Sequence, residues 1–218
     1  MTPKGSLGDR GQAFPIYIVV VAGLLFAALA FFVVGQASVV RSDAQGAADA
    51  AALAAARDAR DHLVPGVDLA TLEPGGWKKV LEGVLLDAGG ACGAAREFAA
   101  KNDATAVCEP ALPRFTVEVQ TARTVGDSVV PGTSGQRGTA NATAVVEPRC
   151  QLGTVIVAPS PSASPSTSPS PSPSSGGAEK PASVEIKCKG AGVITFDPAK
   201  PEPWGALART LFAVRLVD

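Results

Sequence analysis

The sequence predicts an α+β protein built around one long N-terminal helix that starts in a membrane and continues beyond it. Three observations support this class. Residues 11–40 carry no charged side chain. Residues 41–63 are rich in alanine and contain no proline. After them, short helical patterns give way to strand patterns, and segregated helices and strands are typical of α+β domains.

The first part of this helix is long enough to cross a bilayer. The stretch FPIYIVVVAGLLFAALAFFVV, from Phe14 to Val34, extends roughly 30 Å as a helix, which matches the thickness of the hydrocarbon layer. The alternative is a signal peptide cleaved after Ala28-Leu29-Ala30. An apolar region longer than about 7–15 residues, continuing past that site, favours a retained anchor. We therefore predict a tail at 1–10 and a transmembrane helix at 11–40.

The alanine-rich segment 41–63 is predicted to continue the helix as a stalk outside the lipid. Alanine is the best helix former but has almost no side chain to bury. A rod or a close-packed bundle suits such a surface better than a globular core does. Small residues also let helices approach closely. The helix-packing candidates are Gly23 and Ala27 in the span, and Ala51 and Ala55 in the stalk.

Residues 64–218 are predicted to form one small exported domain of mixed helices and strands. The helix candidates are 76–86, with Trp77, Val80, Leu81, Val84 and Leu85 on one face, and 91–101. In 115–123, apolar Phe115, Val117 and Val119 alternate with polar residues, which predicts a half-buried strand. Residues 125–138 are predicted to be a loop. The remaining strand candidates are 139–146, 154–157, 184–189, 193–196 and 211–217, the last favoured as strand over helix.

The segment 158–183 contains APSPSASPSTSPSPSPSSGG and is predicted to be a disordered insertion. Proline at every second or third position forbids both helix and sheet, so the chain stays extended and solvated. After it only about 40 residues remain, too few for an independent core. The segment is therefore placed within one domain rather than between two.

All four cysteines, Cys92, Cys108, Cys150 and Cys188, follow the predicted span. An even number in an exported region indicates disulfides, although four cysteines allow three connectivities. Pairing of neighbours is favoured, Cys92 with Cys108 and Cys150 with Cys188. The first pair closes a loop of about 17 residues, worth on the order of 3 kcal/mol in the chain-entropy model. The alternative is four reduced, buried thiols.

The orientation in the membrane rests on charge and on these cysteines. Lys4 and Arg10 precede the span and Arg41 follows it, so the positive charges are nearly balanced. Asp43 and Asp49 soon follow Arg41, which favours a cytoplasmic N-terminus. Cysteines that need an oxidising exterior agree. We expect a single-pass protein of the cell membrane with an extracytoplasmic C-terminal domain.

Nothing in the sequence indicates an enzyme, a cofactor or a metal. The one histidine, His62, stands at the predicted end of the helix, where capping is its ordinary role. No metal-binding pair of histidines, phosphate-binding loop or nucleophile elbow occurs. The formal net charge of −1, without a basic block, also predicts no nucleic-acid partner.

The N-terminal quarter resembles a known family. A short tail ending Asp9-Arg10-Gly11 precedes the span, and Arg41 is followed by QGAADAAALAAA at 45–56. This order of parts is similar to the TadE/TadG-like proteins of tight-adherence (Tad, or Flp) pilus assembly, especially the actinobacterial ones. The resemblance implies a bitopic structural component, either minor-pilin-like or needed for assembly, whose helix contacts other pilus components. The alternative is a membrane-anchored extracytoplasmic binding domain with the alanine-rich helix as a passive spacer.

Some members of that family are cleaved by a prepilin peptidase after a glycine, with glutamate and tyrosine at the fifth and sixth positions that follow. Gly11 corresponds to that glycine, and Tyr17 stands sixth. Ile16 occupies the place of the glutamate, so cleavage is not predicted.

Overall fold

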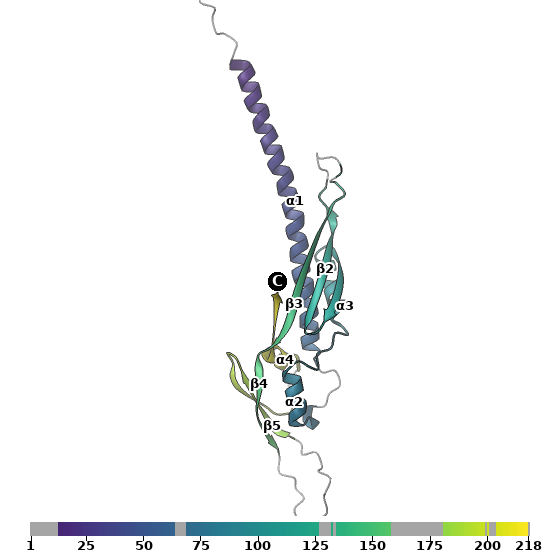
Figure 1. The fold of residues 1–218 in the computed structure, drawn as a ribbon, viewed down its shortest axis with the longest axis vertical. Coiled ribbons are helices and arrows are strands. Elements are labelled where there is room, and N and C mark those ends of the chain that lie inside the picture. The colour runs from purple at the N-terminus through teal and green to yellow at the C-terminus, as the bar shows by residue number, and fades with distance from the viewer. Residues whose placement is uncertain are drawn as a thin grey trace, which may run out of the picture.

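The computed structural model describes residues 13–63, 69–126, 132, 134–157, 181–198, 200 and 204–217. One helix, α1 (Ala13–Asp61), runs along most of the long axis of the molecule. The N-terminal half of α1 projects free of all other elements, and the rest of the chain gathers along its second half (Figure 1). The prediction of one uninterrupted helix is confirmed.

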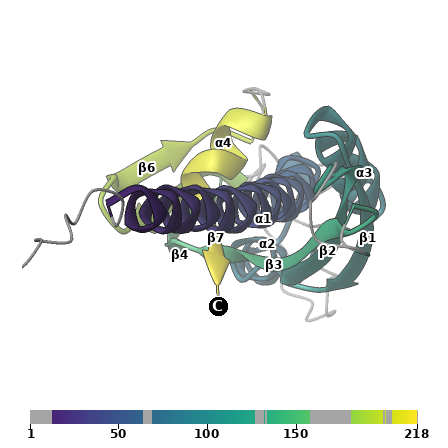
Figure 2. The ribbon, with the colours of Figure 1, turned by 90° about the horizontal axis from the view of Figure 1, so that it is seen from above.

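A four-stranded antiparallel sheet curves around the second half of α1 (Figure 2). Its order is β1-β2-β3-β7, with bounds Ala104–Ala111, Arg114–Thr124, Arg137–Pro148 and Phe212–Val217. Phe115, Val117 and Val119 of β2 are buried against the helix, as their alternation predicted. The sequence did not indicate β1, whose alternation is interrupted by Pro110 and Ala111.

A second sheet lies at the end of the molecule farthest from the free half of α1 (Figure 1). Its order is β4-β5-β6, with bounds Cys150–Val157, Pro181–Cys188 and Gly192–Phe196. Residues 158–180 of the predicted insertion lie outside the described residues. The predicted C-terminal boundary of this insertion, residue 183, is too late, because Pro181 and Ser183 already pair with Val157 and Ile156.

Three short helices complete the described part of the domain, with a 3-10 turn at Leu69–Thr71. They are α2 (Pro74–Leu81), α3 (Ala91–Lys101) and α4 (Trp204–Leu211). The predicted helix 76–86 is shorter than expected, because Gly83 adopts a φ of 73° and ends it. Val84 therefore leaves the apolar face and is 64% exposed. Helix α4 was not predicted.

The alanine-rich half of α1 is the centre of the core, which corrects the prediction of a solvated stalk. Nine alanines between Ala44 and Ala59 are at most 5% exposed. Ala51 and Ala55, expected to face other helices on a rod, are fully buried inside their own chain. The physical reason is that methyl side chains let strands and α3 approach the helix closely. Alanine on α3 does the same: Ala91, Ala95 and Ala99 are fully buried.

Gly138 is a point of close approach between β3 and α1. A Cβ at Gly138 would lie 2.5 Å from the carbonyl oxygen of Val40 and 3.1 Å from the Cβ of Ala44. No real side chain fits at such a distance from a backbone atom. Glycine on the strand and alanine on the helix are therefore complementary halves of one packing arrangement.

Both favoured disulfides are present. Cys92–Cys108 joins α3 to β1, and Cys150–Cys188 joins β4 to β5 at directly opposed positions of the ladder. The second bridge closes the chain around residues 158–180, so the two strands flanking that segment belong to one domain.

Candidate functional site

Two surfaces of the described chain stand out: the exposed part of α1 and a hollow lined by cationic side chains. The free half of α1 exposes large apolar residues from Phe14 to Val39. The most apolar stretch of this helix is long enough to cross a membrane, and none of it is buried. Gly23 and Ala27 lie in this half, and within the described residues nothing lies within 4 Å of a Cβ built at Gly23. Their packing against another helix stays a prediction.

The buried half of α1 also keeps one face uncovered, which we call the open strip. Its members, spaced three or four residues apart, are Ser42, Gly46, Ala50, Leu53 and Arg57. Ser42, Gly46 and Arg57 are exposed, and the other two are half-buried. A Cβ at Gly46 would meet open space. The strip continues the exposed apolar half along the same helix. The single glycine of the alanine-rich segment was the available sequence signal for it.

Charged side chains beside the strip hold α1 to the domain. Asp43 accepts a hydrogen bond from Arg123 of β2 at 3.0 Å. Asp61 is 3.7 Å from Arg209 of α4 and 2.9 Å from Arg60. These contacts join α1 to the domain near both ends of its buried half.

His62 has the capping role expected of it. Its Nδ1 lies 3.0 Å from the carbonyl oxygen of Asp58 and 3.4 Å from that residue's carboxylate. A histidine bonded to the last turn of its own helix is explained by helix termination. Within the part of the chain that the structure describes, no group of three His, Cys, Asp or Glu side chains could hold a metal ion.

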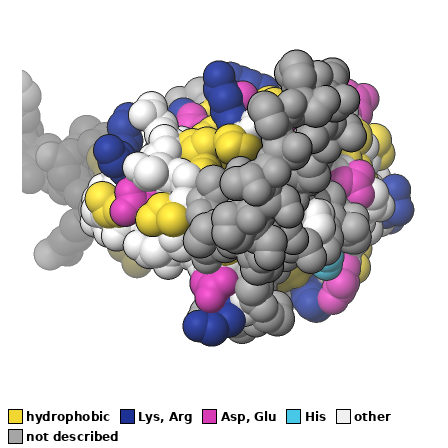
Figure 3. Space-filling model, turned by 90° about the horizontal axis from the view of Figure 1, so that it is seen from below, with side chains coloured by type: hydrophobic (Ala, Val, Ile, Leu, Met, Phe, Trp, Pro, Cys, Tyr) yellow, Lys and Arg dark blue, Asp and Glu magenta, His cyan; other side chains and the backbone are white. Residues whose placement is uncertain are grey.

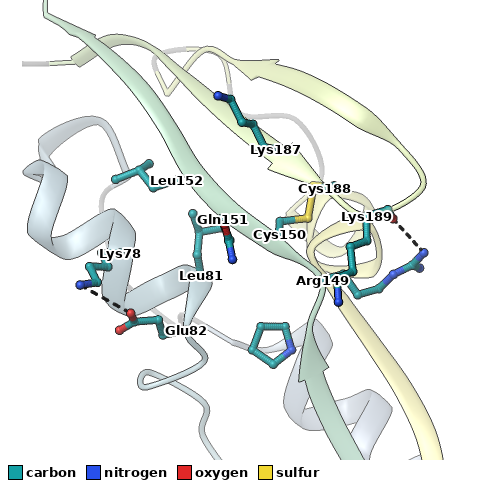
Figure 4. Close-up of a pocket in the computed structure, with 11 residues that line it drawn as sticks. Lys78, Leu81, Glu82, Arg149, Cys150, Gln151, Leu152, Lys187, Cys188 and Lys189 are labelled. Carbon is teal, nitrogen blue, oxygen red and sulfur yellow. Dashed lines mark hydrogen bonds and ion pairs between the residues drawn. A yellow bond between two sulfur atoms is a disulfide. The ribbon is translucent and has the colours of Figure 1, made fainter.

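The hollow lies between α2 and the strands β4 and β5 (Figure 4). Its volume is about 760 Å³. The lining residues are Lys78, Leu81, Glu82, Pro148, Arg149, Cys150, Gln151, Leu152, Lys187, Cys188 and Lys189. Lys78 comes from α2, and Glu82, the residue that caps this helix, lies 3.8 Å from it. On the other side, Arg149 donates a hydrogen bond to the carbonyl oxygen of Lys189 at 3.4 Å. The sequence does not indicate this cluster, because its members come from three separate segments.

The end of the molecule away from the apolar helix is otherwise mixed in charge. Seen from below, its described surface shows Lys and Arg beside Asp and Glu, with hydrophobic side chains between them (Figure 3).

On the outer face of the main sheet, Arg215 donates a hydrogen bond to Glu147 at 2.8 Å. This contact lowers the pKa of Glu147 and raises that of Arg215. On α3, a hydrogen bond from Lys101 likewise lowers the pKa of Glu97.

Comparison with known proteins gives one finding for the helix. Residues 11–58 match a family described as putative Flp pilus-assembly TadE/G-like. The match covers the apolar half of α1 and most of its alanine-rich half. No curated protein and no solved structure matches the chain.

Proposed function

We propose that this chain, which carries a TadE/G-like region in its long helix, is a bitopic membrane component of a Tad/Flp-type pilus assembly or secretion apparatus. Its role in this proposal is structural, either as a minor-pilin-like subunit or as an assembly component. The single observation that carries the proposal is the continuity of α1. From Ala13 onward, the matched residues belong to one helix, whose first half is exposed and apolar and whose second half is the core of a domain.

The proposed topology has residues 1–10 in the cytoplasm and the folded domain outside. Two disulfides support an extracytoplasmic domain, because such bonds persist in oxidising compartments. A membrane-impermeant thiol reagent applied to intact cells tests this. Labelling of the cysteines only after reduction from outside is expected, whereas labelling only after lysis would place the domain in the cytoplasm.

We further propose that the open strip and the apolar half of α1 together receive the helix of a neighbouring component. A surface of small residues lets another backbone come close, and the strip runs on directly from the membrane-embedded face. The large apolar residues Phe14 to Val39 suit lipid or a second helix equally. The strip lies where such a helix would leave the bilayer.

Co-purification tests this proposal. The protein, extracted from its native membranes in mild detergent, is expected to bring pilus-assembly components with it. Gly46→Leu is expected to abolish that association while preserving the fold, because the position opens to solvent. Gly93→Leu is the matched control, since it makes the same change at an exposed helical glycine of α3 with open space around it. Equal recovery of partners by both variants would refute the docking strip. Isolation of the unmodified protein alone would refute the assembly role.

A second candidate function is a membrane-anchored binding domain. The hollow between α2 and β4 favours it, because a structural subunit does not need a cationic hollow. In this candidate the alanine-rich helix is not a passive spacer, because it forms the core of the domain.

A further inference from the structure

The hollow between α2 and the second sheet carries more positive charge than its surroundings explain. Four of its lining side chains are cationic, namely Lys78, Arg149, Lys187 and Lys189, against the one carboxylate of Glu82. All of these side chains are exposed. We propose that this hollow is a binding site for a phosphate-rich polymer. The proposal is independent of the role in pilus assembly.

The strand register brings three of these cations together. Cys150 is opposite Cys188, and the amide of Lys189 donates to the carbonyl of Arg149, so Arg149 and Lys189 are directly opposed. Lys187 of β5 lies opposite Gln151, two residues before Lys189, which directly follows the strand. Arg149 and Lys189 stand just beyond the ladder pair Cys150 and Cys188, and like charges that lie opposite one another are destabilising. A cluster that the fold does not need points to a ligand that neutralises it.

Nearby carboxylates do not neutralise the cluster. Glu82 is the partner of Lys78 on its own helix. Glu147 is engaged by Arg215, although Lys189 contributes to lowering its pKa. Glu185, two residues before Lys187 on β5, does not line the hollow. The lining therefore keeps an excess of three positive charges, counted as four cations less one carboxylate.

The spacing of the cations suits an extended polymer. Residues two apart on a strand are about 6.6–6.8 Å apart, and opposed residues about 4.5–5.5 Å. Successive charged groups of one chain can therefore meet successive cations. The cationic residues come from both sides of the hollow, with Lys78 on α2 and the other three on the side of the sheet (Figure 4). A tetrahedral phosphate offers oxygens in several directions, whereas a carboxylate offers two in one plane. Arginine binds phosphate in a forked geometry.

The location rules out the lipid of the protein's own membrane as this ligand. The second sheet lies at the end of the molecule farthest from the apolar half of α1 (Figure 1). With α1 in the bilayer, the hollow faces away from the lipid headgroups.

Binding to inorganic polyphosphate tests the proposal directly. The full-length protein in nonionic detergent is titrated with fluorescently labelled polyphosphate, and the anisotropy gives Kd at several salt concentrations. The site variant is Arg149→Gln/Lys187→Gln/Lys189→Gln. We expect its Kd to rise by about tenfold or more and the slope of log Kd against log salt to become shallower, as for lost phosphate contacts.

The control variant, Lys79→Gln/Arg96→Gln/Lys101→Gln, removes the same charge at exposed positions outside the hollow. It is expected to bind as the unmodified protein does. Equal weakening by the two variants would overturn the site, since attraction would then follow net charge alone. Poly-L-glutamate of matched length distinguishes the chemistry: binding as tight as that of polyphosphate would overturn the assignment to phosphate. In the absence of ligand, the site variant should melt no lower than the unmodified protein, because it relieves like-charge repulsion.

Discussion

Replacing Gly138 with alanine is the most direct test of the helix-centred core. The new methyl group would lie 2.5 Å from the carbonyl oxygen of Val40, which is shorter than real Cβ contacts. Strand β3 or helix α1 must therefore move, and both are held by the surrounding sheet. Overpacking of this kind costs about 1–3 kcal/mol. Alanine's small intrinsic advantage over glycine in a strand, roughly 0.5–1 kcal/mol, offsets only part of that cost.

The same substitution at Gly46 provides the matched control. There the methyl group meets open space, and alanine is about 0.5–1 kcal/mol better than glycine inside a helix. With a shift of about 2–4 °C per kcal/mol for a domain of 150–250 residues, Gly46→Ala should raise the melting temperature by about 1–4 °C. Gly138→Ala should instead lower it by up to about 10 °C.

Near-ultraviolet circular dichroism of the full-length protein in detergent measures both melting temperatures. This signal follows tertiary packing in the domain and is insensitive to helix that persists in the micelle. A rise in the melting temperature of Gly138→Ala, like that expected for Gly46→Ala, would refute the close contact between β3 and α1. A large loss of stability in Gly46→Ala would refute the uncovered face of the helix.

Three further outcomes are expected. In non-reducing conditions, alkylation should leave Cys150 and Cys188 unmodified, and ready labelling before reduction would contradict the bridge. Replacing both cysteines by serine should destabilise the domain by about 4 kcal/mol in the chain-entropy model, which denaturant titration measures. Because Arg215 lowers the pKa of Glu147 in the folded protein, this pair should stabilise the protein fully above the ordinary carboxyl pKa of 4.5 and lose that effect as the pH falls through the lowered value. Glu147→Gln should flatten this part of the curve of stability against pH. The same decrease in stability at acidic pH in both proteins would show that the pair contributes nothing. Deleting 159–175, outside the described residues, should leave the melting temperature nearly unchanged, since loop closure depends only weakly on length; a fall of many degrees would show that the segment is packed.

The sequence predicted most elements because their local signals were strong. Helix α1 has a long run without proline, β2 has strict alternation, and α3 has the predicted bounds. The disulfide pairing also followed from proximity along the chain. In each of these cases, the information lay within a few neighbouring residues or one short loop.

The packing of α1 could not be predicted in this way. Alanine indicates a helix but does not show what covers it, and a solvated rod and a closely wrapped core helix share the same composition. Gly138, which makes the wrapping possible, lies in what resembled an ordinary glycine-rich loop. The cationic hollow could not be predicted for a related reason, since Lys78 and Lys187 come to line the same hollow only through tertiary structure.

The unbroken passage of α1 from its exposed half into the domain has a mechanical consequence. Within the described residues, α1 has no break at which the domain could swing, so a tilt of its apolar half is passed on to the whole domain. A pulling force on the domain would be transmitted along one continuous helix. The contacts between α1 and the sheet around it would bear this force as shear. A force on the domain would therefore also change the direction of the apolar half of α1.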